Sequence, residues 1–415
     1  MGVMQQRPLR VLAADDSVVM RGILAKLFEL HAGDGRSELP RMELCGVAQD
    51  GAACLDAVRR LCPDVLVLDL EMPKLNGLEV LDRLFVERPG LPVIMCSAHT
   101  EHGARSTLEA LARGAADYVT KPSEQKDFST AMLSLSRQLL PRIAALARRS
   151  NRDVRAQPGA AADKVDRAER ANAGGAPPKP SGAIEVVVIG LSTGGPSALE
   201  QLLPSLPRSF PVPVLIVQHM PKLFTGALAE RLDRCCALRV EQAYENAALR
   251  PGTVWLAPGD SHLEVAPRAT MPGDTEPGSN PGSKARGGRI RLHQQEPLNH
   301  CRPSVDYLFF SAARMYGPAA LALVMTGMGS DGLDGARAVH EGGGVVLAQD
   351  EASSAVWGMP GRVSEAGIAT ATLPLSAIGT VLQQRVNAGR QIDAIGQPRM
   401  EAGAQARREI SHGLL

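Results

Sequence analysis

Residues 185–196, Glu185-Val-Val-Val-Ile-Gly-Leu-Ser-Thr-Gly-Gly-Pro196, join a short apolar run to a glycine-rich turn. The run is typical of a strand buried on both faces, and the stretch that begins at Pro196 has the length and spacing of a helix. A strand, a tight turn and a helix in this order form the repeating unit of α/β proteins with parallel sheets. The segment therefore predicts an α/β domain, with Ser192 at the carboxyl end of its first strand.

The same alternation of apolar runs and helical stretches continues downstream. Two strand-like runs, His262–Val265 and Ile290–His293, flank a polar segment and predict an antiparallel hairpin, so we expect a mixed but mostly parallel sheet. The other expected strands are Glu185–Ile189, Val212–Val217, Thr253–Leu256, Leu321–Met325 and Val345–Ala348, and the expected helices include Pro196–Leu203, Ser304–Met315 and Leu333–His340.

Upstream of the turn, the first part of the chain predicts a second α/β domain. Five apolar runs alternate with amphipathic stretches of helical length, which predicts five βα units in a doubly wound parallel sheet with helices on both faces. Ligands of such sheets bind at the carboxyl ends of the strands. The five runs are Leu9–Ala14, Glu43–Ala48, Val65–Leu68, Pro92–Cys96 and Asp117–Thr120.

Two segments of the sequence could bury almost no apolar surface. Between residues 157 and 182 the only large aliphatic side chain is Val165, which predicts a flexible linker. Residues 266–289 contain four prolines and five glycines, which predicts an extended disordered loop. We expect a domain over residues 1–147, a linker over 148–182, a second domain over 183–386 and a polar tail over 387–415.

Composition excludes several classes of protein. The 415 residues suggest two or three domains. Lys and Arg number 45 and Asp and Glu 44, so the net charge of +1 provides no general attraction to nucleic acid or anionic membrane. The seven cysteines form no CxxC pair, which favours reduced thiols. No run approaches the ~20 apolar residues of a membrane span, and residues 1–10 lack the core of a signal peptide, so we expect a cytoplasmic protein.

Carboxylates gather at the predicted strand ends of the N-terminal domain. Asp15 and Asp16 follow the first strand and Asp69 follows the third, so the three should meet at one edge of the sheet. Mg²⁺ binds a few carboxylates together with phosphate oxygens, which suits transfer of a phosphoryl group to a carboxylate. Ser97 and Lys121 end the fourth and fifth strands, where a hydroxyl and an ammonium could bind the phosphoryl oxygens.

This combination resembles the receiver domain of two-component response regulators. The resemblance covers about residues 8–147 and includes Asp69-Leu-Glu-Met-Pro73, Gly77 and Lys121-Pro122. It implies a flavodoxin-like fold phosphorylated by a histidine kinase. The implied roles are phospho-acceptor for Asp69, Mg²⁺ ligands for Asp15, Asp16 and Asp69, and switch residues for Ser97, Tyr118 and Lys121.

The C-terminal domain carries the pattern of a serine hydrolase. Gly190-Leu-Ser-Thr-Gly194 matches G-x-S-x-G in the strand–turn–helix context of a nucleophile elbow. A serine nucleophile needs a base and a group that orients the base. His219 follows the strand that ends at Val217, and Asp331 lies in the glycine-rich turn after Met325, so both should reach the same sheet edge as Ser192. Weaker candidates for the acid are Asp334 and Asp350.

Two other readings of this domain stay open. A glycine-rich turn before a helix can also cradle a phosphate, as in a transferase, although neither G-x-G-x-x-G nor G-K-[ST] is present. A response regulator can also act through a binding output without catalysis. The chain order Ser, His, Asp differs from that of α/β-hydrolases, so the interpretation depends on geometry and not on ancestry with that fold.

Four segments in this order behind a receiver resemble the CheB family of chemotaxis protein-glutamate methylesterases. They are Gly190–Pro196, Gln218–Pro221, Ala257–Gly259 and Thr326–Gly332. The sequence departs from the family at Leu191, where a smaller residue is common, and in the long insertion at 266–289.

The resemblance implies a Ser192–His219–Asp331 triad and no cofactor in the catalytic domain. It implies hydrolysis of glutamate γ-methyl esters on methyl-accepting chemoreceptors, with release of methanol, and deamidation of receptor glutamines. It also implies that the receiver acts as a phosphorylation-controlled lid, with a chemotaxis histidine kinase as phosphodonor. For the oxyanion hole we expect backbone N–H groups of Thr193 and Met328.

Overall fold

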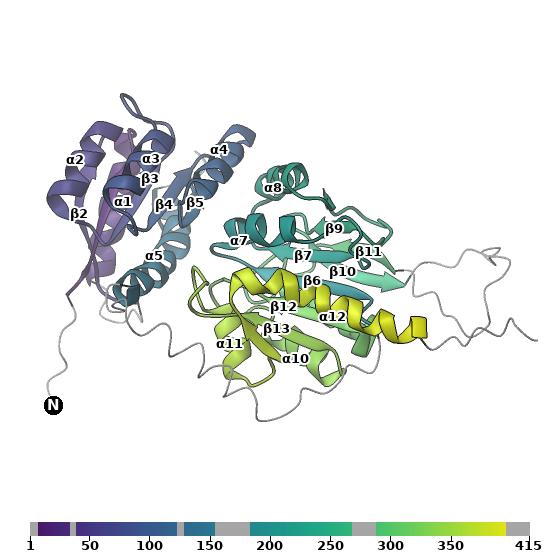
Figure 1. Ribbon diagram of the computed structural model, residues 1–415. Coiled ribbons are helices and arrows are strands. Elements are labelled where there is room, and N and C mark those ends of the chain that lie inside the picture. Colours follow the sequence, from purple (N-terminus) through teal and green to yellow (C-terminus); the bar gives the residue numbers. More distant parts are fainter. Residues whose placement is uncertain (1–6, 34–38, 123–127, 154–182, 268–287, 396–415) are drawn as a thin grey trace, which may run out of the picture.

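A computed structural model describes residues 7–33, 39–122, 128–153, 183–267 and 288–395, which form two α/β domains (Figure 1). Most of the expected linker, the loop between 268 and 287 and the tail after 395 lie outside these residues. Within them, one helix extends to Asp153 and another to Ile395, beyond the boundaries expected at 147 and 386. No helix in the described ranges is long and apolar enough to span a membrane.

The N-terminal sheet has five parallel strands in the order β2-β1-β3-β4-β5, which confirms the expected doubly wound fold. The strands are β1 (Leu9–Ala14), β2 (Met42–Ala48), β3 (Val65–Asp69), β4 (Val93–Ser97) and β5 (Asp117–Thr120), and the helices are α1 (Val18–Gly33), α2 (Gly51–Leu61), α3 (Gly77–Glu87), α4 (Glu101–Ala112) and α5 (Phe128–Asp153).

Helices cover both faces of this sheet because alternate strand residues point to opposite sides. Val11 and Ala13 pack with α1 and α5, whereas Leu12 and Ala14 pack with α2, α3 and α4. Side-chain caps fix where α2 and α3 begin: Asp50 accepts a hydrogen bond from the backbone N–H of Ala53, and Asn76 forms a capping box with Glu79. The carboxyl ends of β1 and β3, which carry the aspartates, therefore lie at the same edge of the sheet.

The C-terminal sheet has seven strands in the order β14-β13-β12-β6-β7-β9-β8. Its strands are β6 (Val186–Leu191), β7 (Val214–Gln218), β8 (Arg239–Gln242), β9 (Thr253–Leu256), β12 (Ala320–Val324), β13 (Val345–Gln349) and β14 (Ala371–Leu373). The helices are α7 (Gly195–Leu202), α8 (Lys222–Cys235), α9 (Val305–Tyr316), α10 (Leu333–Glu341), α11 (Met359–Glu365) and α12 (Leu375–Ile395), with 3₁₀ turns η1 (Leu203–Ser205) and η2 (Gly317–Ala319).

The expected parallel arrangement and the expected antiparallel hairpin are confirmed, but the prediction that the hairpin makes the main sheet mixed is wrong. Every strand pair of the seven-stranded sheet is parallel, and the antiparallel hairpin of β10 (His262–Pro267) and β11 (Gly288–His293) forms a sheet of its own. The hairpin packs on α9, whose Ser311 hydroxyl accepts a hydrogen bond from the backbone N–H of Val265 at 3.0 Å. A helix lies against the hairpin and separates it from the main sheet.

The two domains meet where α4 packs against α7 and α8 (Figure 1). The ring of Tyr118, which follows the first residue of β5, stacks on Phe224 of α8 with centroids 4.8 Å apart. On the opposite face of the N-terminal sheet, the cluster that contains α5 also includes Met328 and Val356 of the C-terminal domain. The N-terminal domain therefore rests beside the strand ends that carry Ser192.

Candidate active site

Ser192 is the first residue after β6, and its turn requires glycine. Gly194 has φ +77°, in the left-handed region that glycine favours. A Cβ on Gly195 would lie 1.8 Å from Oε1 of Gln218, so a larger residue does not fit without displacing that side chain. The backbone N–H of Ser192 donates to the carbonyl of Thr326 at 3.0 Å, which ties the turn to the loop after β12.

His219 is the first residue after β7, the neighbour of β6. Leu191 pairs with Gln218 in the parallel register, so the next residues along the two strands are Ser192 and His219. Gln218 strengthens this arrangement, because its Nε2 donates to the carbonyl of Ser192 at 2.9 Å. The predicted nucleophile and base thus occupy adjacent strand ends.

Asp331 completes the group from the loop after β12. Its Oδ2 lies 2.8 Å from Nε2 of His219, and its carboxylate is 3% exposed. Burial alone raises the pKa of Asp331, but the hydrogen bonds from His219 and Ser304 outweigh burial and hold the pKa below its ordinary value. Burial also lowers the pKa of His219, but the contacts with Asp331 and Cys301 together more than reverse this, so the pKa of His219 is raised.

The pairing with Asp331 leaves Nδ1 of His219 as the nitrogen that can act on Ser192. Within the described ranges no hydrogen bond joins His219 to the Ser192 hydroxyl, and the contact at Nδ1 is with Cys301 Sγ at 3.7 Å. Such catalytic hydrogen bonds often form only when substrate is bound. The weaker acid candidates lie elsewhere: Asp334 pairs with an exposed arginine, and Asp350 holds Ser353.

The loops around Ser192 can form an oxyanion hole. Thr193 is buried, and its carbonyl accepts a hydrogen bond from the Thr326 hydroxyl at 2.8 Å. Gly327, which precedes Met328, lies close to Ser192: a Cβ added to Gly327 would be 2.9 Å from the Cβ of Ser192. In the described part of the chain, the backbone N–H groups of Thr193 and Met328 have no acceptor, so both are free to bind developing negative charge.

The N-terminal carboxylates also meet as predicted. Asp15 and Asp69 are buried, Asp16 is exposed, and each contributes an oxygen to a cluster whose atoms lie within 4.8 Å of one another. Lys121 Nζ lies 3.0 Å from Asp15 and 2.8 Å from Asp69. Burial and the charge of Asp15 raise the pKa of Asp69 to about 6, although Lys121 opposes them. One ammonium therefore leaves an excess of negative charge, which fits a divalent cation.

The three predicted switch residues occupy different positions. Lys121 binds the carboxylates, and Ser97 is fully buried with its hydroxyl 3.1 Å from the carbonyl of Gly103. Tyr118 points away from this cluster toward Phe224 of the other domain. Lys121 therefore lies at the carboxylate cluster, and Tyr118 lies at the domain junction.

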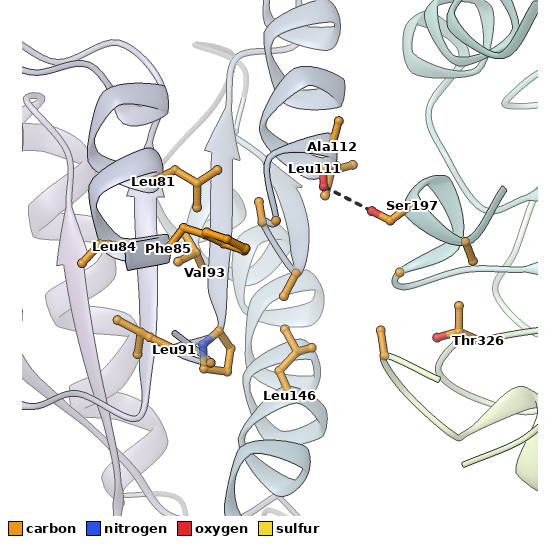
Figure 2. A pocket seen from close by; sticks show the side chains of 18 of the residues that line it. Leu81, Leu84, Phe85, Leu91, Val93, Leu111, Ala112, Leu146, Ser197 and Thr326 are labelled. Atoms are coloured by element: carbon orange, nitrogen blue, oxygen red, sulfur yellow. Dashed lines mark hydrogen bonds between the residues drawn. The ribbon is translucent and has the colours of Figure 1, made fainter. Parts of the chain in front are cut away.

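The domain junction includes Thr193, the residue next to Ser192. Thr193 Oγ1 donates to Oδ2 of Asp117 at 2.8 Å, and Arg142 Nε also donates to that oxygen, at 2.9 Å. Nearby, Ser197 Oγ donates to the carbonyl of Leu111 at 3.2 Å (Figure 2). A cavity of about 470 Å³ lies beside these contacts, with Leu111 and Ser197 among the residues that line it.

Comparisons with known proteins agree with both halves of this geometry. The family model described as response regulator receiver domain matches residues 11–133, and the model described as CheB methylesterase matches residues 187–382. A protein-glutamate methylesterase/protein-glutamine glutaminase of Nocardioides sp. is 44% identical over 378 residues, which cover 91% of this chain and 95% of the relative. This chain belongs to the CheB methylesterase family.

Relatives of the family extend to distant organisms. The protein-glutamate methylesterase/protein-glutamine glutaminase of Thermotoga maritima is 37% identical over 89% of this chain and 96% of its own length. The crystal structure of the Thermotoga maritima CheB methylesterase catalytic domain is 38% identical, covers 49% of this chain and 98% of that domain, and gives a TM-score of 0.44.

Sequence reasoning missed the residues that hold Asp331 in place. Ser304 Oγ donates to Asp331 Oδ1 at 2.6 Å, and Asn299 Nδ2 donates to the same oxygen at 3.2 Å. The backbone N–H of Val305 donates to Oδ2 at 2.7 Å. Ser304 carries a recognisable signal, since it is the first residue of the expected helix and is the N-cap of α9 in the structure. Asn299 lies in an irregular segment without periodicity.

Proposed function

We propose that this protein is a phosphorylation-regulated hydrolase that removes methyl groups from glutamate γ-methyl esters of chemoreceptors and deamidates receptor glutamines. Membership of the CheB family supports the substrate class. The observation that carries the proposed site is the direct hydrogen bond between His219 and Asp331. His219 directly follows β7, and β7 pairs with β6, the strand that Ser192 directly follows. Both reactions are acyl transfers and use the same residues.

In the proposed mechanism, His219 Nδ1 removes the proton of the Ser192 hydroxyl as the oxygen attacks the ester carbonyl. Asp331 accepts a hydrogen bond from Nε2–H and stabilises the imidazolium that forms. The backbone N–H groups of Thr193 and Met328 bind the oxyanion. The imidazolium returns its proton to the leaving methanol, or to ammonia from a glutamine. Water, deprotonated by His219, then hydrolyses the acyl-enzyme and restores a glutamate.

The receiver controls access to this site in the proposed function. A kinase transfers a phosphoryl group to Asp69, and Mg²⁺ held by Asp15, Asp16 and Asp69 would neutralise charge on the transferred group. Ser97 and Lys121 bind phosphoryl oxygens, and Tyr118 carries the change to Phe224 at the junction. Phosphorylation then shifts the population toward an open form. The protein acts in the cytoplasm, on the cytoplasmic helices of the receptors.

The test is a methanol-release assay on a methylated receptor fragment. Ser192→Ala removes the nucleophile, so turnover should fall by roughly 10³-fold or more. Ser205→Ala is the matched control, because the Ser205 hydroxyl bonds to the carbonyl of Leu202 in its own 3₁₀ turn. That control should keep wild-type turnover, and near-normal release of methanol by Ser192→Ala would exclude the proposed nucleophile.

A further inference from the structure

The free nitrogen of the proposed base lies beside a thiol. Cys301 Sγ is 3.7 Å from Nδ1 of His219, on the side of the imidazole away from Asp331. A tight turn positions this cysteine: Leu298 and Cys301 exchange backbone hydrogen bonds of 3.2 and 2.9 Å, and the two residues between them, Asn299 and His300, have φ of 53° and 62°. Two such residues define a hairpin turn of fixed geometry.

The separation of the two atoms matches a pair of metal ligands. Zn²⁺ binds imidazole nitrogen at about 2.0–2.1 Å and thiolate sulfur at about 2.3 Å, so a tetrahedral angle places the two atoms about 3.6 Å apart. A thiolate and an imidazole together favour zinc over Mg²⁺, which prefers oxygen. These residues also lie with Asp331 in a cluster whose ligand atoms are within 4.8 Å of one another.

A third residue already prepares the imidazole for a metal. Histidines that bind zinc commonly donate their other N–H to a carboxylate, which fixes the ring and makes the free nitrogen a better ligand. Asp331 does this at Nε2, at 2.8 Å. The arrangement that makes Nδ1 of His219 a base therefore also makes it a ligand.

We propose that Cys301 Sγ and His219 Nδ1 bind one Zn²⁺ ion, and that the bound ion inhibits the hydrolase. The thiol releases its proton to solvent when the metal binds, and water completes the coordination. The lone pair on Nδ1 that must accept the Ser192 proton is then engaged by the metal. The inhibitory effect rests on the proposed role of His219, whereas the binding site itself does not.

Two other groups could bind metal and must be controlled. Cys235 and Cys236 have their sulfurs 3.9 Å apart, so both should be replaced by serine in the parent protein. The carboxylates around Asp69 offer oxygen ligands, and excess Mg²⁺ should occupy them. The full chain with both serines, in saturating Mg²⁺, is the reference for each measurement.

Binding is measured with Co²⁺, which substitutes for zinc and absorbs light through its bond to thiolate. We expect a sulfur-to-cobalt charge-transfer band that saturates at one equivalent in the reference protein and is lost in both Cys301→Ser and Cys301→Ala. Zinc should displace the cobalt and abolish the band. A reference protein without the band, or a band that survives both substitutions, would overturn the proposal.

Inhibition is measured as methanol release against free Zn²⁺, with each variant compared to its own metal-free rate. The free Zn²⁺ concentration that halves methanol release should be at least about tenfold higher for Cys301→Ser than for the reference protein. A chelator should restore the metal-free rate of the reference protein. An unchanged zinc response in Cys301→Ser would overturn inhibition through this site. If the cobalt band depends on Cys301 but the reference protein releases no methanol, the metal site stands and the proposed hydrolase fails.

Discussion

His219 takes its chemical character from the side chains around it. Burial would keep this imidazole neutral, but its contacts with Asp331, first, and with Cys301 favour the protonated form and raise the pKa of His219. A general base must be neutral before it accepts a proton. The same carboxylate that orients His219 therefore shifts the active form of the hydrolase to higher pH.

We expect kcat/KM for ester hydrolysis to rise with pH along a limb that lies above ~6.5, the ordinary pKa of histidine. Below the raised pKa, His219 is protonated and inactive, and activity appears as pH increases through that pKa. In Asp331→Asn the favourable charge is lost, so the limb should move to lower pH while the plateau falls by roughly 10⁴-fold.

The pH profile is measured on the catalytic rate of each variant against a methylated receptor fragment. Asp334→Asn is the control, because Asp334 is exposed and pairs with Arg337. It should leave the limb in place. A limb that keeps its position in Asp331→Asn would mean that this carboxylate does not set the pKa of His219.

The positions of the proposed triad residues could be predicted from sequence, and those of the residues that support them could not. Ser192, His219 and Asp331 each follow an apolar run, so their common edge follows from strand pattern alone. Asn299 and Cys301 reach His219 and Asp331 through a turn in an irregular segment, where no periodicity indicates direction. Their contacts with the triad depend on the path of the loop in three dimensions.

At the scale of the secondary-structure elements, the junction of β6 and α7 determines where Ser192 lies. The turn fits because Gly195 leaves room for Gln218, which in turn donates a hydrogen bond to the carbonyl of Ser192. A strand, a turn and a neighbouring strand are thus linked through one side chain. A substitution at the start of α7 should therefore shift the position of Ser192.

We expect Gly195→Ala to lower kcat by at least about tenfold, because its Cβ would lie 1.8 Å from Oε1 of Gln218 and displace the side chain that holds Ser192. The loss in thermal stability should be small compared with the loss in activity, since the far end of Gln218 can move. The measurements are methanol release and a melting curve on the same samples.

Gly226→Ala is the matched control for this substitution. Gly226 lies in α8, and a Cβ added to it would be 3.7 Å from the nearest atom, which is an ordinary contact. Alanine also has a higher helix propensity than glycine. This variant should keep its activity and melt at the same or a higher temperature. Equal kcat in Gly195→Ala and Gly226→Ala would show that Gln218 does not position Ser192.

The strands that sequence reasoning missed are short and lie at sheet edges. β8 reads Arg239-Val-Glu-Gln242 and β14 spans Ala371–Leu373, so neither contains the apolar run that identifies a buried strand. The hairpin of β10 and β11 was found, but its separation from the main sheet depends on α9 packing against it. Local sequence patterns predict where strands lie more readily than they predict which strands pair with each other.

At the scale of the whole molecule, the receiver and the catalytic domain make contact within one residue of Ser192, the proposed nucleophile. Thr193 donates a hydrogen bond to Asp117 of the receiver, and Tyr118 stacks on Phe224. An aromatic pair of this kind contributes ~0.5–1.5 kcal/mol beyond burial. Arg105 of α4 and Glu230 of α8 add an ion pair of 3.7 Å. These contacts join side chains on two separate domains, so sequence indicated a lid but not its contacts.

We expect removal of residues before Ile184 to raise basal esterase activity by at least about tenfold, because the truncated chain has no receiver beside Ser192. In the full chain, a small-molecule phosphodonor with Mg²⁺ should raise methanol release, and Asp69→Asn should abolish that response without lowering the basal rate. A truncated protein less active than the unphosphorylated full chain would contradict inhibition by the receiver.

The hollow between the two domains limits how firmly they can hold each other. Phe85, in its wall, is 68% exposed, and atoms separated by an empty space gain almost no dispersion energy when the halves come together. Such a gap removes part of the dispersion energy that the junction could gain, so we expect thermal motion to separate the halves for part of the time. We therefore expect the unphosphorylated protein to have a measurable basal esterase activity. Phosphorylation then needs to change the free energy difference between the closed and open forms only slightly.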